Sequence, residues 1–337
     1  MATSTPVNRL AESEDKSLKL DFSVVIPTYQ GRDRIPQVLG ALKQQTGQEN
    51  IRWEIIVVDN NSTDGTADFI RNEQATWPHP FPLHYCLETQ QGEGFARNRG
   101  VREAKGMLVG FLDDDNIPTP HWLQTAIAFA TEHPQAGAFS GRIHGDLAAP
   151  PPEGFEKIAA FLAIRDRGSQ PHLFQPEKLQ LPPSAGLVVQ RQAWLEAMPD
   201  TPLLKGRAGS SMVGGEDYES LLHLHAQGWE IWYAPELEIS HKIPARRLEK
   251  AYLLSLAYGI GLTTCSLQVA TKENWQIPAA IFRNFFGSAR RVALHWIASR
   301  KILDRDLVAA FQMQLHRGSL ESSFLAIRKL FSRQLSR

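Results

Sequence analysis

The chain has 337 residues, of which 42% are hydrophobic and 21% charged, and its Lys and Arg residues balance its Asp and Glu residues. This composition is that of an ordinary globular protein and excludes a disordered or fibrous chain. Two cysteines are too few for a disulfide framework and fit a reducing compartment. Charge is uneven along the chain, because residues 271–337 hold twelve basic and four acidic side chains. The first 270 residues therefore carry about −8, which argues against a nucleic-acid partner.

Buried strands and amphipathic helices alternate along the first third of the chain. Short apolar or β-branched runs predict strands at 22–26, 53–58, 83–87 and 107–112, with helices at 34–45, after Ser62 or Thr63 as the N-cap, and at 95–104. This order predicts an α/β fold with a mostly parallel, Rossmann-like sheet flanked by helices. Residues 1–21 are polar, show no signal peptide, and are expected to form a flexible extension.

Further strands are expected from residue 138 onward, with loops between some of them. Strands are expected at 138–143, 185–189, 229–234 and 237–241, and helices at 122–132 and from about 217 to 227. The segments 149–152 and 165–183 are expected to be loops of the kind that often form lids and binding surfaces.

Three consecutive carboxylates, Asp113, Asp114 and Asp115, end the strand expected at 107–112. Ligands of open parallel sheets bind at the carboxyl edge, and crowded carboxylates repel one another unless a cation or solvent relieves them. Oxygen ligands of this kind suit Mg²⁺ or Mn²⁺, especially beside a diphosphate. A solvated acidic turn is the alternative interpretation.

Polar residues also follow the other expected strands. Pro27, Thr28 and Tyr29 offer backbone groups, a hydroxyl and an aromatic face that suit a nucleobase, although Tyr29 could equally be a packing residue. Asp59 can accept hydrogen bonds from a base or a ribose. Arg97 follows a glycine-bearing loop and can act as a charged fork near phosphate.

The order and spacing of these motifs resemble the family 2 glycosyltransferases. The similar segments are 24–29, 56–66, 94–100, 111–115, 183–191 and 215–217, within residues 22–241. The resemblance implies a GT-A fold and inverting transfer of a sugar from a nucleotide diphosphate-sugar. It also implies that Pro27, Thr28, Tyr29 and Asp59 hold the nucleoside, with Arg97 near the nucleotide.

The same resemblance assigns roles to the acidic residues. Asp115 is implied to bind Mn²⁺ or Mg²⁺ directly, while Asp113 or Asp114 contacts the ribose or a metal-bound water; Asp113 and His241 complete the implied metal set. A structural role for His241 stays open. Asp217 is implied to be the general base, and Glu216 its neighbour contacting acceptor or donor sugar.

The resemblance predicts a GT-A catalytic domain over residues 22–245, with a nucleotide-binding half at 22–116 and an acceptor-side half at 117–245. Residues 246–337 are expected to be a helical, basic region. Residues 251–270 carry no charge, so a membrane span and a buried helix both stay open. The aromatic and basic helix at 281–297 suits a membrane interface, packing on the catalytic domain, or a homo-oligomer contact.

We therefore expect an inverting glycosyltransferase, cytoplasmic and at the inner face of the membrane, that builds a cell-surface polysaccharide or glycolipid. Its partners are expected to be a nucleotide diphosphate-sugar and a saccharide or lipid-linked saccharide acceptor. One alternative is a sugar-phosphate nucleotidyltransferase, which would favour a glycine-rich basic loop where residues 27–32 stand. The other alternative is a non-catalytic nucleotide-sugar-binding scaffold.

Overall fold

The structure, a computed structural model, describes residues 20–199, 204, 206 and 212–335, with side chains up to Arg328. Most of the expected N-terminal extension, residues 1–19, lies outside the described residues. Leu20 and Asp21 begin the first strand, β1.

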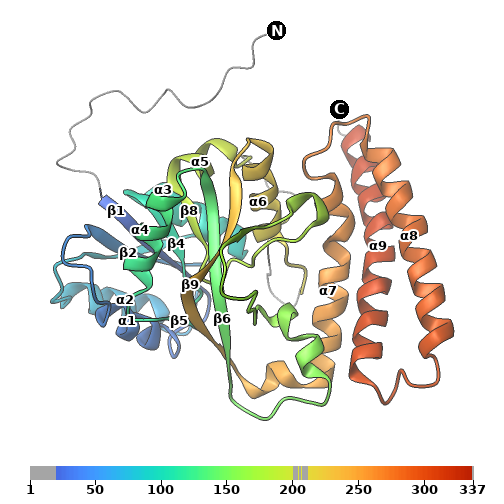
Figure 1. The fold of residues 1–337 in the computed structure, drawn as a ribbon, viewed down its shortest axis with the longest axis horizontal. Helices are drawn as coiled ribbons and strands as arrows, with labels where there is room; N and C mark the ends of the chain where they lie inside the picture. The colour runs from blue at the N-terminus through green and yellow to red at the C-terminus, as the bar shows by residue number, and fades with distance from the viewer. Residues whose placement is uncertain (1–19, 200–203, 205, 207–211, 336–337) are drawn as a thin grey trace, which may run out of the picture.

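A single sheet organises the described part of the chain (Figure 1), with strand order β3-β2-β1-β4-β8-β6-β9-β5 and β7 beside β9. The strands are β1 (Leu20–Thr28), β2 (Trp53–Asp59), β3 (Leu83–Leu87), β4 (Gly106–Phe111), β5 (Asn116–Pro118), β6 (Ala136–Leu147), β7 (His172–Leu173), β8 (Val188–Gln190) and β9 (Glu230–Ile243). β1 to β4 pair in parallel, as do β6 and β9, whereas β5, β7 and β8 run antiparallel to their neighbours. The predicted α/β fold with a central sheet is confirmed.

Helices cover both faces of this sheet because alternate strand residues point to opposite sides. The α-helices are α1 (Ile35–Lys43), α2 (Thr66–Ala75), α3 (Glu93–Glu103), α4 (Trp122–Glu132), α5 (Arg191–Ala197), α6 (Glu216–Ala226), α7 (Lys250–Val269), α8 (Ile277–Ser299) and α9 (Leu307–Leu335). Val24 and Ile26 of β1 share a hydrophobic cluster with α1, α2 and α4, whereas Val25 belongs to a second cluster with α3, α5 and α6. The sheet is thereby buried between two helical layers.

Short 3₁₀ helices complete the described elements: η1 (Phe155–Lys157), η2 (Ala159–Leu162), η3 (Pro176–Lys178) and η4 (Ala245–Leu248). One of them, η3, lies in the segment 165–183 that the sequence predicts as a loop. η2 and η4 matter for function, because both contribute side chains or carbonyl groups to the site described below.

Two local expectations were wrong. The two strands expected at 229–234 and 237–241 are one strand, β9, because a bulge opposite Gly141 accommodates Pro235. The N-cap of α2 is Gly65, in the left-handed region at φ 86°, rather than Ser62 or Thr63. Those two hydroxyls accept hydrogen bonds from the backbone and side chain of Gln30 instead.

The C-terminal helices stand beside the sheet domain, with α9 between α7 and α8 (Figure 1). Phe311 of α9 packs in one cluster with Leu253 and Leu256 of α7 and with Leu162 of η2. By length and composition α7 is the one described helix that could cross a membrane, and 44% of its apolar window is buried inside the protein. The expected helical character of residues 246–337 agrees with the described part, while the domain boundary itself stays a prediction.

Candidate active site

A cavity of about 560 Å³ opens at the carboxyl ends of β1 and β4. Of the site residues named from the sequence, its lining includes Pro27, Thr28, Tyr29, Arg97, Asp113, Asp114, Asp115, Glu216, Asp217 and His241. Parallel pairing of β1 with β4 brings the loops after these two strands to one edge, which explains the meeting of distant segments.

Asp59 is the sequence-predicted residue that is not among the described residues lining the cavity, although its neighbour Asn60 is. Asp59 is buried, and its two carboxylate oxygens accept hydrogen bonds from the Ser62 backbone N–H at 2.9 Å and the Tyr85 hydroxyl at 3.1 Å. Its role in holding the nucleoside stays a prediction.

Hydrogen bonds to Asp114 connect the β1–α1 loop to the end of β4. Its Oδ1 accepts from Arg34 Nε at 2.7 Å, and its Oδ2 accepts from Arg34 Nη2 at 2.9 Å and from Thr28 Oγ1 at 2.6 Å. Burial raises the pKa of Asp114, although the bidentate bonds from Arg34 oppose this rise. A Cβ atom at Gly31 would overlap Thr28 Oγ1, so glycine is needed at this close approach. Asp114 thus positions the loop that carries Tyr29.

Arg97 is buried and contacts three carboxylates. Its Nη1 donates to Glu216 Oε1 at 2.8 Å, and its Nη2 donates to Asp113 Oδ1 at 3.1 Å and to Glu93 Oε2 at 3.3 Å. This network joins the end of β4 to the beginnings of α3 and α6. Arg97 therefore holds the cavity wall together, whatever contact it makes with a nucleotide.

One guanidinium cannot neutralise three carboxylates in a buried place. Burial, reinforced by the charges of Glu93 and Asp217, raises the pKa of Glu216 to about 8 against the opposing charge of Arg97. Burial likewise raises the pKa of Asp113 to about 6, again opposed by Arg97. Glu216 therefore retains a proton at neutral pH, and its Oε2 has no hydrogen-bond partner among the described residues.

Asp217 is the second residue of α6. The N-cap of this helix is Gly215, whose φ is 91°. Its Oδ2 accepts from the Ser184 backbone N–H at 3.2 Å and its Oδ1 from the Tyr218 backbone N–H at 2.9 Å. Backbone donors and the positive end of the helix dipole both favour a negative charge here. The carboxylate is half-buried at the cavity and held in one orientation, as a proton acceptor requires.

Asp115 and His241 come together through the short strand β5. Asn116 of β5 pairs with His241 of β9, and the backbone C=O of Asp115 accepts from the Lys242 N–H at 2.9 Å. His241 Nε2 consequently lies 3.5 Å from Asp115 Oδ1. Burial would raise the pKa of Asp115, but its contacts with His241 and Arg247 outweigh this effect and lower the pKa.

The donor chemistry of this pair fits a divalent cation. His241 Nδ1 lies 2.9 Å from the Leu162 carbonyl oxygen and can donate a proton there, which in the neutral ring leaves the Nε2 lone pair on the side of Asp115 and available to a cation. Among the described residues there is no cluster of three His, Cys, Asp or Glu side chains placed for a metal. Two protein ligands suit Mg²⁺ or Mn²⁺ when a diphosphate supplies further oxygens. The implied role of Asp113 as a third ligand stays a prediction, since its carboxylate contacts Arg97.

Several cavity residues escaped the sequence interpretation. Arg34 and Arg247 lie against Asp114 and Asp115, and an apolar wall comes from Phe161 and Leu162 near η2 and from Leu256 and Ile260 of α7. No spacing rule marks the two arginines, because their partners are fixed only by the tertiary fold. The four-residue spacing of Leu256 and Ile260 indicates one helix face, but not what that face lines.

Residues 23–172 match the family model described as Glycosyl transferase family 2. Glycosyltransferase AglE of Haloferax volcanii is 35% identical over 107 residues, which are 32% of this chain and 34% of that relative. A glucosyl-dolichyl phosphate glucuronosyltransferase of the same organism is 24% identical over 246 residues, 72% of this chain and 75% of the relative. The chain thus spans about a third of the first of these relatives and three quarters of the second.

Solved structures support the fold. A mannosyltransferase from Pyrobaculum calidifontis in complex with GDP-Man and Mn²⁺ is similar with a TM-score of 0.57 and 19% identity, over 92% of this chain and 87% of that one. At this identity the similarity concerns the fold, and the predicted GT-A architecture is confirmed. Residues 23–172 are thus similar to glycosyl transferase family 2, whose model they match.

Proposed function

We propose that this protein transfers a sugar from a nucleotide diphosphate-sugar to an acceptor hydroxyl with inversion at the anomeric carbon. The observation that carries the proposal is that one cavity is lined by the β1–α1 loop, the Asp triplet, the Glu216–Asp217 pair and His241. These groups supply, within one space, a nucleoside surface, oxygen and nitrogen ligands for a cation, and an oriented carboxylate.

Donor binding is proposed at the end of β1. Tyr29 is 45% exposed although it lines the cavity, so its ring can stack on a base. Asp114, Arg34 and Thr28 fix the loop that presents this ring. Mg²⁺ or Mn²⁺ held by Asp115 and His241 would stabilise the negative charge of the leaving diphosphate.

Asp217 is proposed as the general base. Inversion requires the acceptor hydroxyl to attack opposite the diphosphate, and a fixed carboxylate takes the proton as the new bond forms. The two backbone N–H groups that bind Asp217 hold its orientation and leave other lone pairs for the proton. Its neighbour Glu216, which also lines the cavity, is proposed to contact the acceptor or donor sugar.

The acceptor is proposed to carry an apolar group. The cavity side formed by Phe161, Leu162, Leu256 and Ile260 is apolar, in contrast to the acidic side formed by the Asp triplet and the Glu216–Asp217 pair. A polar sugar alone would gain little from this wall, whereas a lipid-linked saccharide would bury its chain there. The relative named for glucosyl-dolichyl phosphate supports an acceptor of this class.

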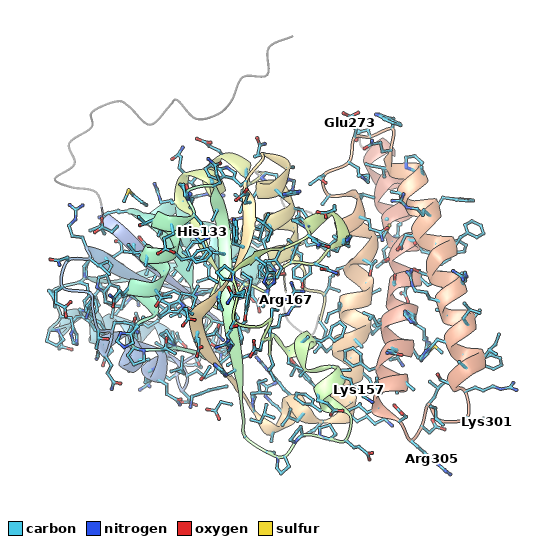
Figure 2. All side chains as sticks on the ribbon, viewed as in Figure 1. His133, Lys157, Arg167, Glu273, Lys301 and Arg305 are labelled. Carbon is cyan, nitrogen blue, oxygen red and sulfur yellow. The ribbon has the colours of Figure 1, made fainter. Side chains whose placement is uncertain are left out.

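We further propose that α8 contacts an anionic membrane, which would place the enzyme at the inner face of the cell membrane, in polysaccharide or glycolipid synthesis. α8 has no acidic residue, and its exposed side chains include Phe282, Phe286, Trp296 and Arg290. Figure 2 shows Lys301 and Arg305 projecting from the α8–α9 connection, so the basic surface continues beyond the helix. A two-fold contact between copies would set this basic surface against itself, which favours a lipid surface over a dimer.

A binding and hydrolysis panel tests the proposed chemistry. GDP-, UDP- and dTDP-sugars are offered to the full chain with Mn²⁺, Mg²⁺ or EDTA, and binding is measured by calorimetry. One donor should bind with metal dependence, and Asp115→Asn should reduce its affinity to the EDTA level, because the variant loses a charged ligand. Asp68→Asn, which changes an exposed carboxylate on α2, should bind as the wild type does. A folded protein that binds none of these donors would support the scaffold alternative.

A further inference from the structure

Arg247 of η4 contacts both candidate metal ligands at once. Its Nη1 lies 3.1 Å from Asp115 Oδ2 and 3.2 Å from His241 Nε2, while Asp115 and His241 lie 3.5 Å apart. The three groups are largely shielded from solvent, with side-chain exposures of 22% for Arg247, 10% for Asp115 and 9% for His241. A positive charge of this protein therefore occupies the position where a cation bridging the two ligands would sit.

The hydrogen-bond pattern makes the Arg247 guanidinium and a divalent metal ion compete for His241 and Asp115. Arg247 Nη1 can only donate, so its contact with His241 Nε2 corresponds to the neutral ring with Nδ1–H directed at the Leu162 carbonyl and the one ring lone pair on Nε2. A lone pair that accepts an N–H cannot bind a metal at the same time. A divalent ion would also repel a guanidinium at this separation, since both charges lie in a poorly solvated place.

The surroundings give the guanidinium room to move. Arg247 lines the active-site cavity and also a second cavity of about 560 Å³. Asp146 and Lys242 belong to this second cavity, where Asp146 offers an exposed carboxylate. Release of Arg247 from Asp115 and His241 therefore needs a side-chain rotation and no rearrangement of the sheet.

We propose that Arg247 is a resident cation of the donor-free site, and that a divalent metal binds Asp115 and His241 only by displacing it. The proposal rests on the proposed metal-assisted function. Displacement lowers the affinity for metal alone, because part of the binding free energy is used to break the Arg247 contacts. A donor diphosphate adds metal ligands and offsets that cost. Arg247 thus couples metal binding to donor binding and keeps the donor-free enzyme largely metal-free.

Mn²⁺ titration of the donor-free full chain tests this, with free Mn²⁺ followed by electron paramagnetic resonance. Arg247→Gln should bind Mn²⁺ at least about tenfold more tightly than the wild type, as expected for removal of two charge-assisted hydrogen bonds. Arg246→Gln removes the same charge from an exposed neighbour and should change the affinity less than about twofold. Asp115→Asn in the Arg247→Gln background should abolish the tight site.

The outcomes separate this proposal from the proposed function. Mn²⁺ binding that depends on Asp115 but is equal or weaker in Arg247→Gln would overturn the role of Arg247 and leave the metal site intact. If no variant bound Mn²⁺, with or without a donor, the metal site itself would be refuted and the proposal with it.

A measurement on the unmodified chain covers the case in which Arg247→Gln does not fold. Phenylglyoxal labels accessible guanidinium groups, and mass spectrometry reports each site. Mn²⁺ together with a nucleoside diphosphate should increase the labelling of Arg247 severalfold and leave that of Arg246 unchanged. Equal labelling of Arg247 with and without Mn²⁺ would contradict displacement.

Discussion

The buried guanidinium of Arg97 faces Glu93, Asp113 and Glu216 at 2.8 to 3.3 Å. Three carboxylates around one positive charge leave an excess of negative charge, which protonation of Glu216 relieves. The surroundings of Glu216 in the folded protein therefore keep it protonated, whether or not it takes part in the reaction. The presence of this proton should be visible in the pH dependence of stability.

We expect Glu216→Gln to become more stable relative to the wild type as pH rises from about 4.5 to 8. The pKa of Glu216 is raised to about 8 in the folded protein, so its stabilising contribution is complete below the unfolded pKa and is lost as pH passes the folded pKa. Glutamine cannot ionise, so the variant avoids this loss. Urea denaturation of both proteins across this range measures the difference, which should grow by about 1 kcal/mol or more. A difference that is flat or falls with pH would contradict the protonated state.

At the scale of elements, α3 positions Arg97 because the helix lies very close to β1. A Cβ atom at Gly100 would overlap a methyl group of Val25, so the contact between helix and strand requires glycine. The same helix carries Glu93 and Arg97 on its first two turns. Moving the helix outward would therefore disturb the carboxylate network as well as the core.

Gly100→Ala should destabilise the protein by about 2 kcal/mol, because overpacking exceeds the gain in helix propensity. Gly40→Ala in α1 is the matched control, since its Cβ would meet nothing within 4 Å. That change should stabilise the protein by up to about 1 kcal/mol. Chemical denaturation of both variants gives the two values. A Gly100→Ala variant at least as stable as the wild type would show that α3 can shift without cost.

Elements with a clear period could be predicted from sequence, and those fixed by tertiary pairing could not. The runs ending at Ile26, Val58 and Leu112 indicate buried strands, and the polar residues after them predict the site. β5 has three residues, too few for any period, yet it sets Asp115 beside His241.

Helix capping and ion pairing also depend on tertiary contacts that the sequence does not reveal. Ser62 and Thr63 are good caps by composition, but Gln30 offers them hydrogen bonds from another loop. Arg34 and Arg247 lie 80 and 132 positions from their carboxylate partners, so only the assembled sheet brings them together. The sequence therefore predicted the acidic residues and Arg97, while Arg34 and Arg247 became apparent only from the fold.

On the scale of the whole molecule, the acidic catalytic part and the basic C-terminal helices form opposite ends of the protein (Figures 1 and 2). α7 belongs to both, because its Leu256 and Ile260 line the active-site cavity while the helix packs against α9. A membrane bound at α8 would thus lie on the side from which α7 approaches the cavity. This arrangement suits an acceptor whose lipid remains in the bilayer.

Vesicle flotation tests this orientation. The full chain should bind phosphatidylcholine vesicles only when phosphatidylserine is included, and salt should weaken binding. Replacing Phe282, Phe286 and Trp296 together by alanine should weaken it by about tenfold or more, because exposed aromatic rings insert at the interface. Met107→Ala removes an exposed apolar side chain at the other end and should have no effect. Equal binding by all three proteins would refute the assignment of α8.

The central claim concerns the cavity, and Asp217→Asn tests it most directly. Once a donor is identified, its binding and the formation of product are measured on the same preparations of wild type and variant. Donor affinity should change by less than about twofold, since the amide keeps the size of the side chain, while transfer should fall by about 10²- to 10⁴-fold with loss of the base. Near-normal turnover in Asp217→Asn would contradict the account and remove Asp217 from the chemistry.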